Sequence, residues 1–283
     1  MTPNDPLYSL QWHFALIGDI ETIWDDYTGE GIRVVVYDSA IDTQHEDLVN
    51  NYDATAHFRF ENDPDTPEDE SLVVYDPDVS NFPDANPLTV GHGTSVAGLI
   101  GAEANNGTGG TGVAPGVTLT SVNFTGDLNP SLAPDLQPGD PGYEEAQQEY
   151  IDKITEVLRY AADPDANFDI MNNSWGVGGT PYDPGASLAD TASEIYQWNL
   201  AYAYIAEFGR DGLGTINVQS AGNAYANANG DGLNASRFNV TVSATNEIGN
   251  AELYSNWGSG ILVAAPGGQG TNFGGNLGSV TTD

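Results

Sequence analysis

Three polar residues, far apart along the chain, carry side chains that together could catalyse acyl transfer. Asp38 closes the apolar run IRVVVYD (32–38), His92 stands in GHGTSVAGLIGA (91–102), and Asn223 follows TINVQSAG. A carboxylate can orient an imidazole, the imidazole can take a proton from a hydroxyl nucleophile, and an amide donor can stabilise the resulting oxyanion. Each residue alone could be an ordinary turn or cap. Their order and sequence context, taken together, favour the catalytic interpretation.

The elements that must position these residues alternate between strand and helix patterns. Apolar strand-like runs are separated by helical patterns, which predicts an α/β fold with a doubly wound, mostly parallel sheet and helices on both faces. In such a sheet functional groups gather at the carboxyl ends of the strands, where Asp38 and Asn223 fall, and His92 is expected to begin a helix. The expected strands are 32–38, 116–124, 169–175, 215–221, 238–245 and 260–266, and the expected helices are 92–105, 142–162 and 187–208.

Composition excludes several classes of function. The chain has 283 residues, 41 acidic against 6 basic, a net charge of −35 and no cysteine. Such a charge should repel nucleic acid and attract cations, so we expect no nucleic-acid partner and a surface suited to salt or to bound divalent ions. No disulfide or thiolate metal site can form. No apolar run is long enough to span a membrane, and the first residues do not resemble a signal peptide.

The segments around the three residues resemble those of the subtilisin-like serine proteases. VVVYDSAIDTQHEDL is similar to the catalytic-Asp segment, GHGTSVAGLIGA to the catalytic-His segment and VQSAGNAYAN to the oxyanion segment, in the same chain order. NDPLYSLQWHF, NNSWG (172–176) and ANNGTGGTGVAPG (104–116) resemble features of the kexin/furin branch. The resemblance covers essentially the whole chain, and it implies a single subtilisin-like catalytic domain over residues 1–283.

The resemblance also implies roles for individual residues. Asp38 orients His92, His92 is the general base, and Asn223 donates to the oxyanion. The backbone of Ser174, Trp175 and Gly176 pairs with an extended polypeptide substrate, and Asp231 is a candidate acid of the pocket for the residue before the cleaved bond. A buried tryptophan at a strand end is the alternative interpretation of NNSWG.

A calcium ion (Ca2+) is the cofactor that the resemblance implies. Calcium takes six to eight oxygen ligands, and the glycines of EANNGTGG allow successive carbonyls to turn inward. The alternative is an ordinary Asn-Gly turn after the His92 helix. The expected ligands are the side chains of Asp5, Asp53 and Asn106 and the backbone carbonyls of Glu103, Thr108 and Gly110.

The sequence departs from the family pattern in places. Ser39 stands where dibasic-specific relatives have a second aspartate, and Ala40 stands where glycine is usual. Cleavage after paired basic residues is therefore not expected. The family's nucleophilic serine follows a segment like GSVTTD, where this sequence ends. We therefore expect a C-terminally incomplete domain, nearly inert by itself, with a downstream β-sandwich domain in a longer protein.

The leading hypothesis is a calcium-stabilised serine endopeptidase, secreted or at the cell surface of a bacterium. A pseudoprotease that binds extended peptides without cutting them is the alternative. A nucleotide-binding α/β domain is disfavoured, because neither a Gly-x-Gly-x-x-Gly after the first strand nor a P-loop occurs.

Overall fold

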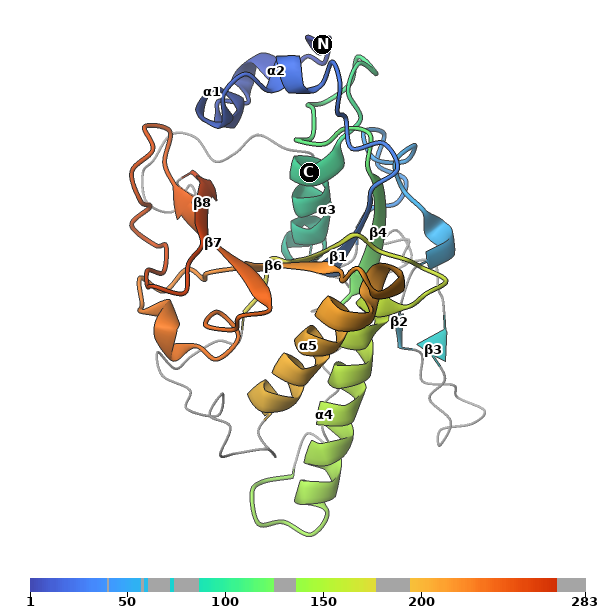
Figure 1. Cartoon of the computed structure of the whole chain (residues 1–283), viewed down its shortest axis with the longest axis vertical. Coiled ribbons are helices and arrows are strands. Elements are labelled where there is room, and N and C mark those ends of the chain that lie inside the picture. Colours follow the sequence, from blue (N-terminus) through green and yellow to red (C-terminus); the bar gives the residue numbers. More distant parts are fainter. Residues whose placement is uncertain are drawn as a thin grey trace.

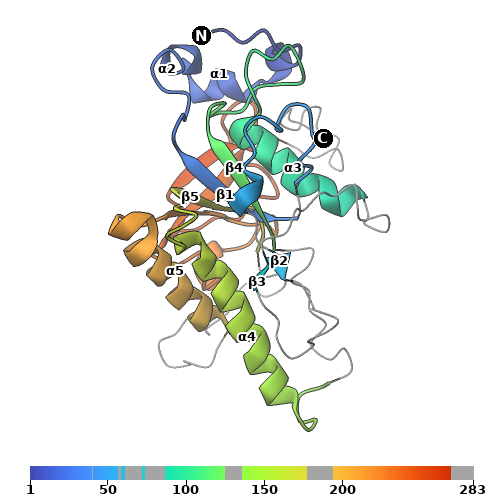
Figure 2. The same ribbon diagram turned by 90° about the vertical axis from the view of Figure 1, so that its right-hand side faces the viewer.

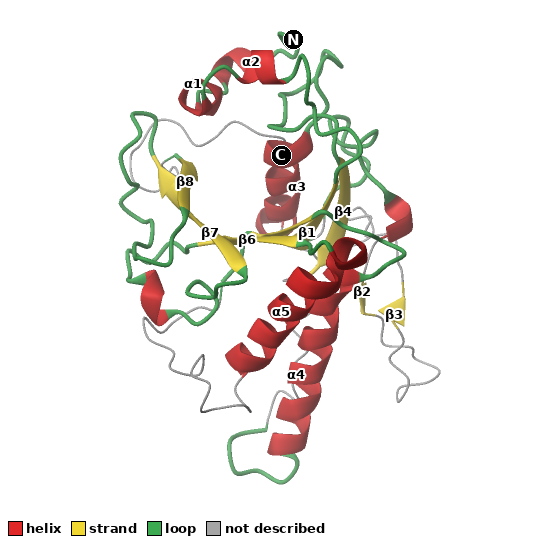
Figure 3. Ribbon diagram, viewed as in Figure 1, coloured by secondary structure: helices red, strands yellow, loops and turns green. Residues whose placement is uncertain are grey.

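A six-stranded parallel sheet forms the centre of the computed structural model, which describes residues 1–39, 41–56, 59–60, 72–73, 87–124, 136–176 and 194–268. The strands are ordered β4-β1-β5-β6-β7-β8, and every neighbouring pair is parallel. Their bounds are β1 Arg33–Asp38, β4 Thr118–Asn123, β5 Ile170–Asn173, β6 Ile216–Ser220, β7 Asn239–Thr245 and β8 Val263–Pro266. All six lie within the runs that the sequence predicts. The doubly wound α/β fold is confirmed (Figures 1 and 3).

The middle of the first strand, β1, is apolar at residues 34–37 because both faces of the sheet are covered. Val34 and Val36 point to one apolar cluster and Val35 and Tyr37 to another, as alternation along a strand requires. All four are at most 2% exposed. The sheet therefore separates two cores, and Asp38 lies at the carboxyl end of β1, beyond the apolar residues.

Helices cover both faces of the sheet, as predicted. Figures 1 and 2 show α3 (Pro87–Gly101) on one side and α4 (Tyr143–Arg159) with α5 (Glu194–Gly212) on the other. The helix α3 approaches the sheet through small residues: Ala97 is fully buried, and a Cβ on Gly101 would lie 2.7 Å from Cγ2 of Val117. A larger residue at position 101 would push the helix off the sheet.

The amphipathic pattern of 142–162 is confirmed in α4 and the 3-10 helix η4 (Tyr160–Ala162) that continues it. Ile154, Leu158 and Ala161 lie in the larger core against Trp198 and Tyr202 of α5. The predicted helix 187–208 appears as α5 from Glu194, and residues 187–193 lie outside the described part. Gly209, Arg210 and Asp211 depart from helical backbone angles, so regular helix ends near Phe208.

One helix boundary corrects a prediction that matters for the site. His92 does not begin its helix, because α3 starts five residues earlier at Pro87. Proline is favoured at the first helical position, since it has no N–H to leave unpaired and its φ is already helical. His92 is therefore held in the second turn of α3, and its exposure does not come from a position at the helix end.

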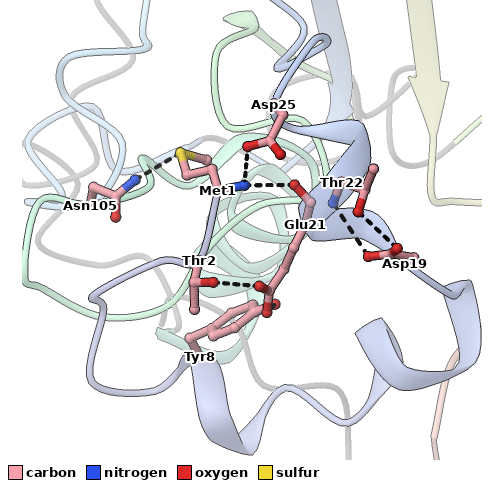
Figure 4. Close-up of polar contacts among 8 residues, drawn as sticks. All are labelled: Met1, Thr2, Tyr8, Asp19, Glu21, Thr22, Asp25 and Asn105. Atoms are coloured by element: carbon pink, nitrogen blue, oxygen red, sulfur yellow. Dashed lines mark hydrogen bonds and ion pairs between the residues drawn. The ribbon is translucent and has the colours of Figure 1, made fainter.

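The N-terminal residues pack as a separate small layer above the end of α3. The elements η1 (Tyr8–Leu10), α1 (His13–Ile17) and α2 (Ile20–Ile23) enclose a cluster of Phe14, Ile20 and Trp24. Figure 4 shows Thr2 and Tyr8 hydrogen-bonded to the carboxylate of Glu21, with the Tyr8 hydroxyl 3.0 Å from Oε1. The same figure shows Asn105 beside Met1, so this arm also touches the loop that follows α3.

Short elements complete the described chain. A two-stranded antiparallel ribbon of β2 and β3, which the sequence did not predict, lies outside the main sheet. In the described part, no helix is both long and apolar enough to cross a membrane. The bounds are η2 Ala54–Ala56, β2 Arg59–Phe60, β3 Leu72–Val73 and η6 Ala228–Gly230.

Candidate active site

The side chains of Asp38 and His92 meet at the carboxyl edge of the sheet. Asp38 Oδ1 lies 2.6 Å from His92 Nδ1. Because a carboxylate only accepts, the contact places the hydrogen on Nδ1 and leaves the lone pair on Nε2. Asp38 is 3% exposed at its side chain and His92 is 54% exposed. A buried acceptor thus holds a half-exposed imidazole with its basic nitrogen directed away from the acid.

The turn after β1 attaches α3 at this point. The Ser39 hydroxyl accepts a hydrogen bond from the backbone N–H of Gly93 at 2.9 Å, and the Thr94 hydroxyl accepts one from the backbone N–H of Asp42 at 2.9 Å. Ser39 N–H also donates to Asp38 Oδ1 at 2.7 Å. Ser39 therefore contacts both Asp38 and the residue that follows His92, while Ala40 lies outside the described residues.

The surroundings of His92 and His13 shift the pKa values of these two histidines in opposite directions. The hydrogen bond to Asp38 raises the pKa of His92 above its ordinary 6.5, against a lowering effect of burial. Burial alone lowers the pKa of His13 to about 4. His92 therefore combines partial exposure with a carboxylate that stabilises its protonated form, as a general base requires.

Asn223 lies three residues beyond β6, at the same carboxyl edge of the sheet. The strands β1, β5 and β6 are parallel neighbours, so the chain leaves each of them on one side of the sheet. Asn223 is exposed, and its side chain makes no hydrogen bond with the residues that the structure describes. Its carboxamide is thus available to a ligand.

The segment Ser174–Gly176 follows β5 on this edge. The Trp175 carbonyl accepts hydrogen bonds from Gln219 Nε2 at 2.5 Å and from Ser220 Oγ at 3.2 Å. The Trp175 ring packs against Phe124, with centroids 4.4 Å apart, and against Trp198. The tryptophan side chain is therefore a structural anchor, and any contact with a ligand falls to the backbone of the segment.

Asp231 is engaged locally. Its Oδ1 accepts from the N–H groups of Leu233 and Asn234, and Oδ2 accepts from the Asn234 side chain at 3.0 Å. Both oxygens are used inside one turn, which is the usual role of aspartate in turns. Within the described residues, the carboxylate of Asp231 therefore stabilises the turn 231–234.

The loop after α3 closes around two buried carboxylates. Asp5, 5% exposed, accepts hydrogen bonds from Asn105 N–H, Gly107 N–H and the Thr111 hydroxyl. The second carboxylate is that of Asp47, which is fully buried. It accepts from Asn106 Nδ2 at 2.8 Å and from Gly110 N–H at 3.0 Å.

The structure places Asp47 against this loop, whereas the described contacts of the Asp53 carboxylate lie elsewhere. The carboxylate of Asp53 instead accepts hydrogen bonds from Arg33, 2.9 Å away, and from Thr55. Burial raises the pKa of Asp53, but the hydrogen bonds from Thr55 and Arg33 outweigh it and the net shift is downward. Asp47 lies nine residues after Asp38, and nothing local in the sequence distinguishes it from its neighbouring acids. Only the fold brings it to the loop.

The donor set around this loop fits a calcium ion. The carbonyls of Glu103, Thr108 and Gly110 accept no hydrogen bond from the described residues. The described part gathers no cluster of three or more His, Cys, Asp or Glu side chains that could hold a metal by themselves. Two carboxylates supplemented by amide and carbonyl oxygens are, however, a set that suits calcium and not a transition metal.

The comparisons with known proteins agree with this geometry. The model of the subtilase family matches residues 29–283, and the chain belongs to this family. It is 27% identical over 274 residues to neuroendocrine convertase 2 of Bos taurus, covering 92% of this chain and 36% of that protein. It is 27% identical over 272 residues to human furin, covering 92% and 28%. The predicted likeness to the kexin/furin branch is confirmed, and the chain spans about a third of the length of these relatives.

Solved structures show the same fold. A protease from Pseudoalteromonas arctica superimposes with a TM-score of 0.65 at 25% identity, covering 100% of this chain and 80% of that one. A serine protease of Aeromonas sobria superimposes with a TM-score of 0.61 at 21% identity, covering 95% and 44%. The subtilisin-like architecture is thereby confirmed.

Proposed function

We propose that the protein is a serine endopeptidase that hydrolyses peptide bonds through an Asp-His-Ser triad. The observation that carries this proposal is the 2.6 Å contact between Asp38 Oδ1 and His92 Nδ1. Membership of the subtilase family supports it. Asp38 holds the imidazole in the tautomer whose Nε2 can accept a proton, and it stabilises the imidazolium that forms.

The reaction requires a serine hydroxyl next to Nε2. In the acylation step the serine oxygen attacks the substrate carbonyl, its proton passes to His92, and the carbonyl oxygen becomes an oxyanion. Asn223 Nδ2 donates to that oxyanion. The imidazolium then gives its proton to the leaving amine, and water repeats the sequence to release the acid. No serine of the described residues is assigned as the nucleophile, and residues 269–283 lie outside the described part.

Substrate is proposed to bind as an extended polypeptide beside Ser174–Gly176. The Trp175 carbonyl is directed toward β6 by Gln219 and Ser220, which fixes the peptide plane between Trp175 and Gly176. A substrate strand could then pair with the backbone of this segment, and main-chain hydrogen bonds would supply affinity without demanding one sequence. Asp231 is proposed to maintain the turn 231–234 and not to select basic residues.

The test uses the protein expressed from its complete reading frame and residues 1–283 in parallel. A fluorophosphonate probe, which acylates activated serines, should label the complete protein and fail to label its His92→Ala variant. Labelling and peptide hydrolysis should be lost together. A complete protein that binds peptides but neither labels nor cleaves would reject this proposal in favour of a peptide-binding pseudoprotease.

We further propose that calcium stabilises the loop 103–111. Asp5, Asp47 and Asn106 would supply side-chain oxygens, and Glu103, Thr108 and Gly110 would supply carbonyl oxygens. When bound, the ion would offset the repulsion between two buried carboxylates that face one loop. It would also tie the N-terminal arm to α3. Calorimetric titration with calcium, on protein from which a chelator has removed bound metal, tests the site without reference to activity.

A location outside the cell is also proposed, on the strength of the net charge of −35. Self-repulsion at this charge is screened by salt, so saline surroundings would favour the folded chain. Fractionation of the native host, with detection in the medium or on the cell surface, tests the location. Recovery of the mature protein only from the cytoplasm would reject it.

A further inference from the structure

We propose that Asn256 is a positioning residue that sets the place of Asn223 in the oxyanion site. Asn256 lies between β7 and β8, 33 positions after Asn223 in the sequence. The inference rests on the proposed peptidase function, since it assigns a partner to the oxyanion donor.

The side chain of Asn256 holds the chain on both sides of Asn223. Its Nδ2 donates to the carbonyl of Ala221 at 2.7 Å. Its Oδ1 accepts from the backbone N–H groups of Ala224, at 3.0 Å, and Ala226, at 2.9 Å. Its own backbone N–H donates to the carbonyl of Gly222 at 2.9 Å. Four hydrogen bonds from one residue therefore bracket Asn223.

This bracket matters because the segment around Asn223 is not a regular element. Gly222 has a φ of +95° and Tyr225 a φ of +49°, so the chain turns through two left-handed conformations. A Cβ on Gly222 would lie 2.6 Å from Asn256 Nδ2, so the amide packs directly against the glycine backbone. The orientation of the Asn223 side chain depends on this turn, since no described residue hydrogen-bonds it.

An amide is the side chain that this place requires. It must donate to Ala221 and accept from Ala224 and Ala226 at the same time, which neither a carboxylate nor an apolar group can do. The amide is also uncharged. In a chain of net charge −35, the position of the oxyanion donor would therefore be fixed by contacts that neither pH nor salt alters.

Other contacts join the same two segments without touching Asn223's neighbours. Asn229 Oδ1 accepts from Gly260 N–H at 2.9 Å and from the Ser259 hydroxyl at 3.2 Å. Asn229 thus links the two segments a few residues further along. It provides a matched control, because its loss would loosen this contact region but leave the bracket of Asn256 intact.

The experiment compares Asn256→Leu, Asn256→Asp and Asn229→Leu in the protein expressed from its complete reading frame. Asn256→Leu removes the donor and the acceptor, and we expect kcat to fall about 10- to 100-fold with KM within about 3-fold, since the oxyanion donor acts on the transition state. In Asn256→Asp, which keeps the acceptor, kcat should fall less. Asn229→Leu should lose thermal stability but keep kcat within about 2-fold.

A double-mutant cycle shows whether the effect acts through Asn223. In an Asn223→Ala background, Asn256→Leu should change kcat by less than about 3-fold, because the donor it positions is gone. An equal loss of kcat in both backgrounds would overturn the proposal. So would an Asn256→Leu variant that keeps full kcat and loses only stability, since that is a purely structural role.

Amide hydrogen exchange separates this inference from the proposed function. The N–H groups of Ala224 and Ala226 should be protected in the wild type and exchange at least about 10-fold faster in Asn256→Leu. An inactive wild type would reject the peptidase function and leave this measurement to decide the positioning role. Unchanged exchange at both amides would reject the positioning role by itself.

Discussion

Asp38 Oδ1 lies 2.6 Å from Nδ1 of His92, although 54 positions separate the two residues in sequence. The contact joins the carboxyl end of β1 to the second turn of α3, and Ser39 secures it from both sides. A buried carboxylate with an imidazole against it fixes the tautomer of the base and favours its charged form. The consequences for catalysis and for stability can be separated by experiment.

The pH dependence of His92 follows from this contact. The hydrogen bond to Asp38 raises the pKa of His92 above 6.5, and the base works only when neutral. The acid limb of kcat/KM should therefore lie above pH 6.5. In Asp38→Asn the limb should move to lower pH, and kcat should fall by about 10⁴. Rate profiles of the complete protein and NMR titration of the imidazole, assigned with His92→Gln, check both. A His92 pKa at or below 6.5 in the wild type would contradict the mechanism.

The same shift predicts a pH-dependent contribution to folding. A histidine whose folded pKa is raised adds stability that is fully present below the unfolded pKa of about 6.5 and lost as the pH rises through the folded pKa. Asp38→Asn should therefore destabilise the protein more at pH 5 than at pH 9, as measured by urea unfolding. In a His92→Gln background, which lacks the titrating group, Asp38→Asn should destabilise the protein equally at the two pH values.

Removal of the oxyanion donor should affect rate and not folding. Loss of such a donor was measured in subtilisin, an enzyme of this family, at about 10²–10³-fold in kcat, and we transfer that magnitude to Asn223→Ala. KM and the melting temperature should stay close to wild type, because the side chain is exposed. Steady-state kinetics and thermal unfolding of one preparation decide this. A large fall in melting temperature would point to a structural role instead.

Two aspartates distinguish the calcium site that we propose from the one predicted from the sequence. Asp47→Asn should abolish the rise in melting temperature that calcium produces, because Asp47 faces Asn106 and Gly110. Asp53→Asn should lose its ion pair with Arg33 but keep the calcium-dependent rise. Thermal unfolding in low salt, with chelator or with calcium, compares the two. If Asp53→Asn alone removed the calcium-dependent rise in melting temperature, Asp53 would be the ligand, as the sequence predicts.

Asp231 should prove structural and not selective. Asp231→Ala removes three hydrogen bonds within the turn 231–234 and should cost about 1–2 kcal/mol of folding free energy. The ratio of kcat/KM for peptides with arginine and with leucine before the cleaved bond should change by less than about 2-fold. A 10-fold loss of preference for arginine would show that Asp231 reads the substrate.

Local pattern was sufficient to predict the six strands of the main sheet. Runs such as IRVVVYD predict buried parallel strands because period and β-branching are properties of a few consecutive residues. The order and context of three motifs, through their resemblance to the subtilisin-like proteases, singled out Asp38, His92 and Asn223, and the structure brings the first two into contact. The predicted start of α3 was wrong. Gly91 indicates a boundary before His92, but the helix begins at Pro87.

Contacts between distant segments were decided only by the tertiary structure. Strand order and register bring Asp47 to Gly110 and Asn256 to Ala221, across 63 and 35 positions of sequence. They also assign Asp53 to Arg33 and leave Trp175 as a core anchor. Sequence fixes which side chains are available at each strand end. The packing of all the elements together determines which of these side chains meet.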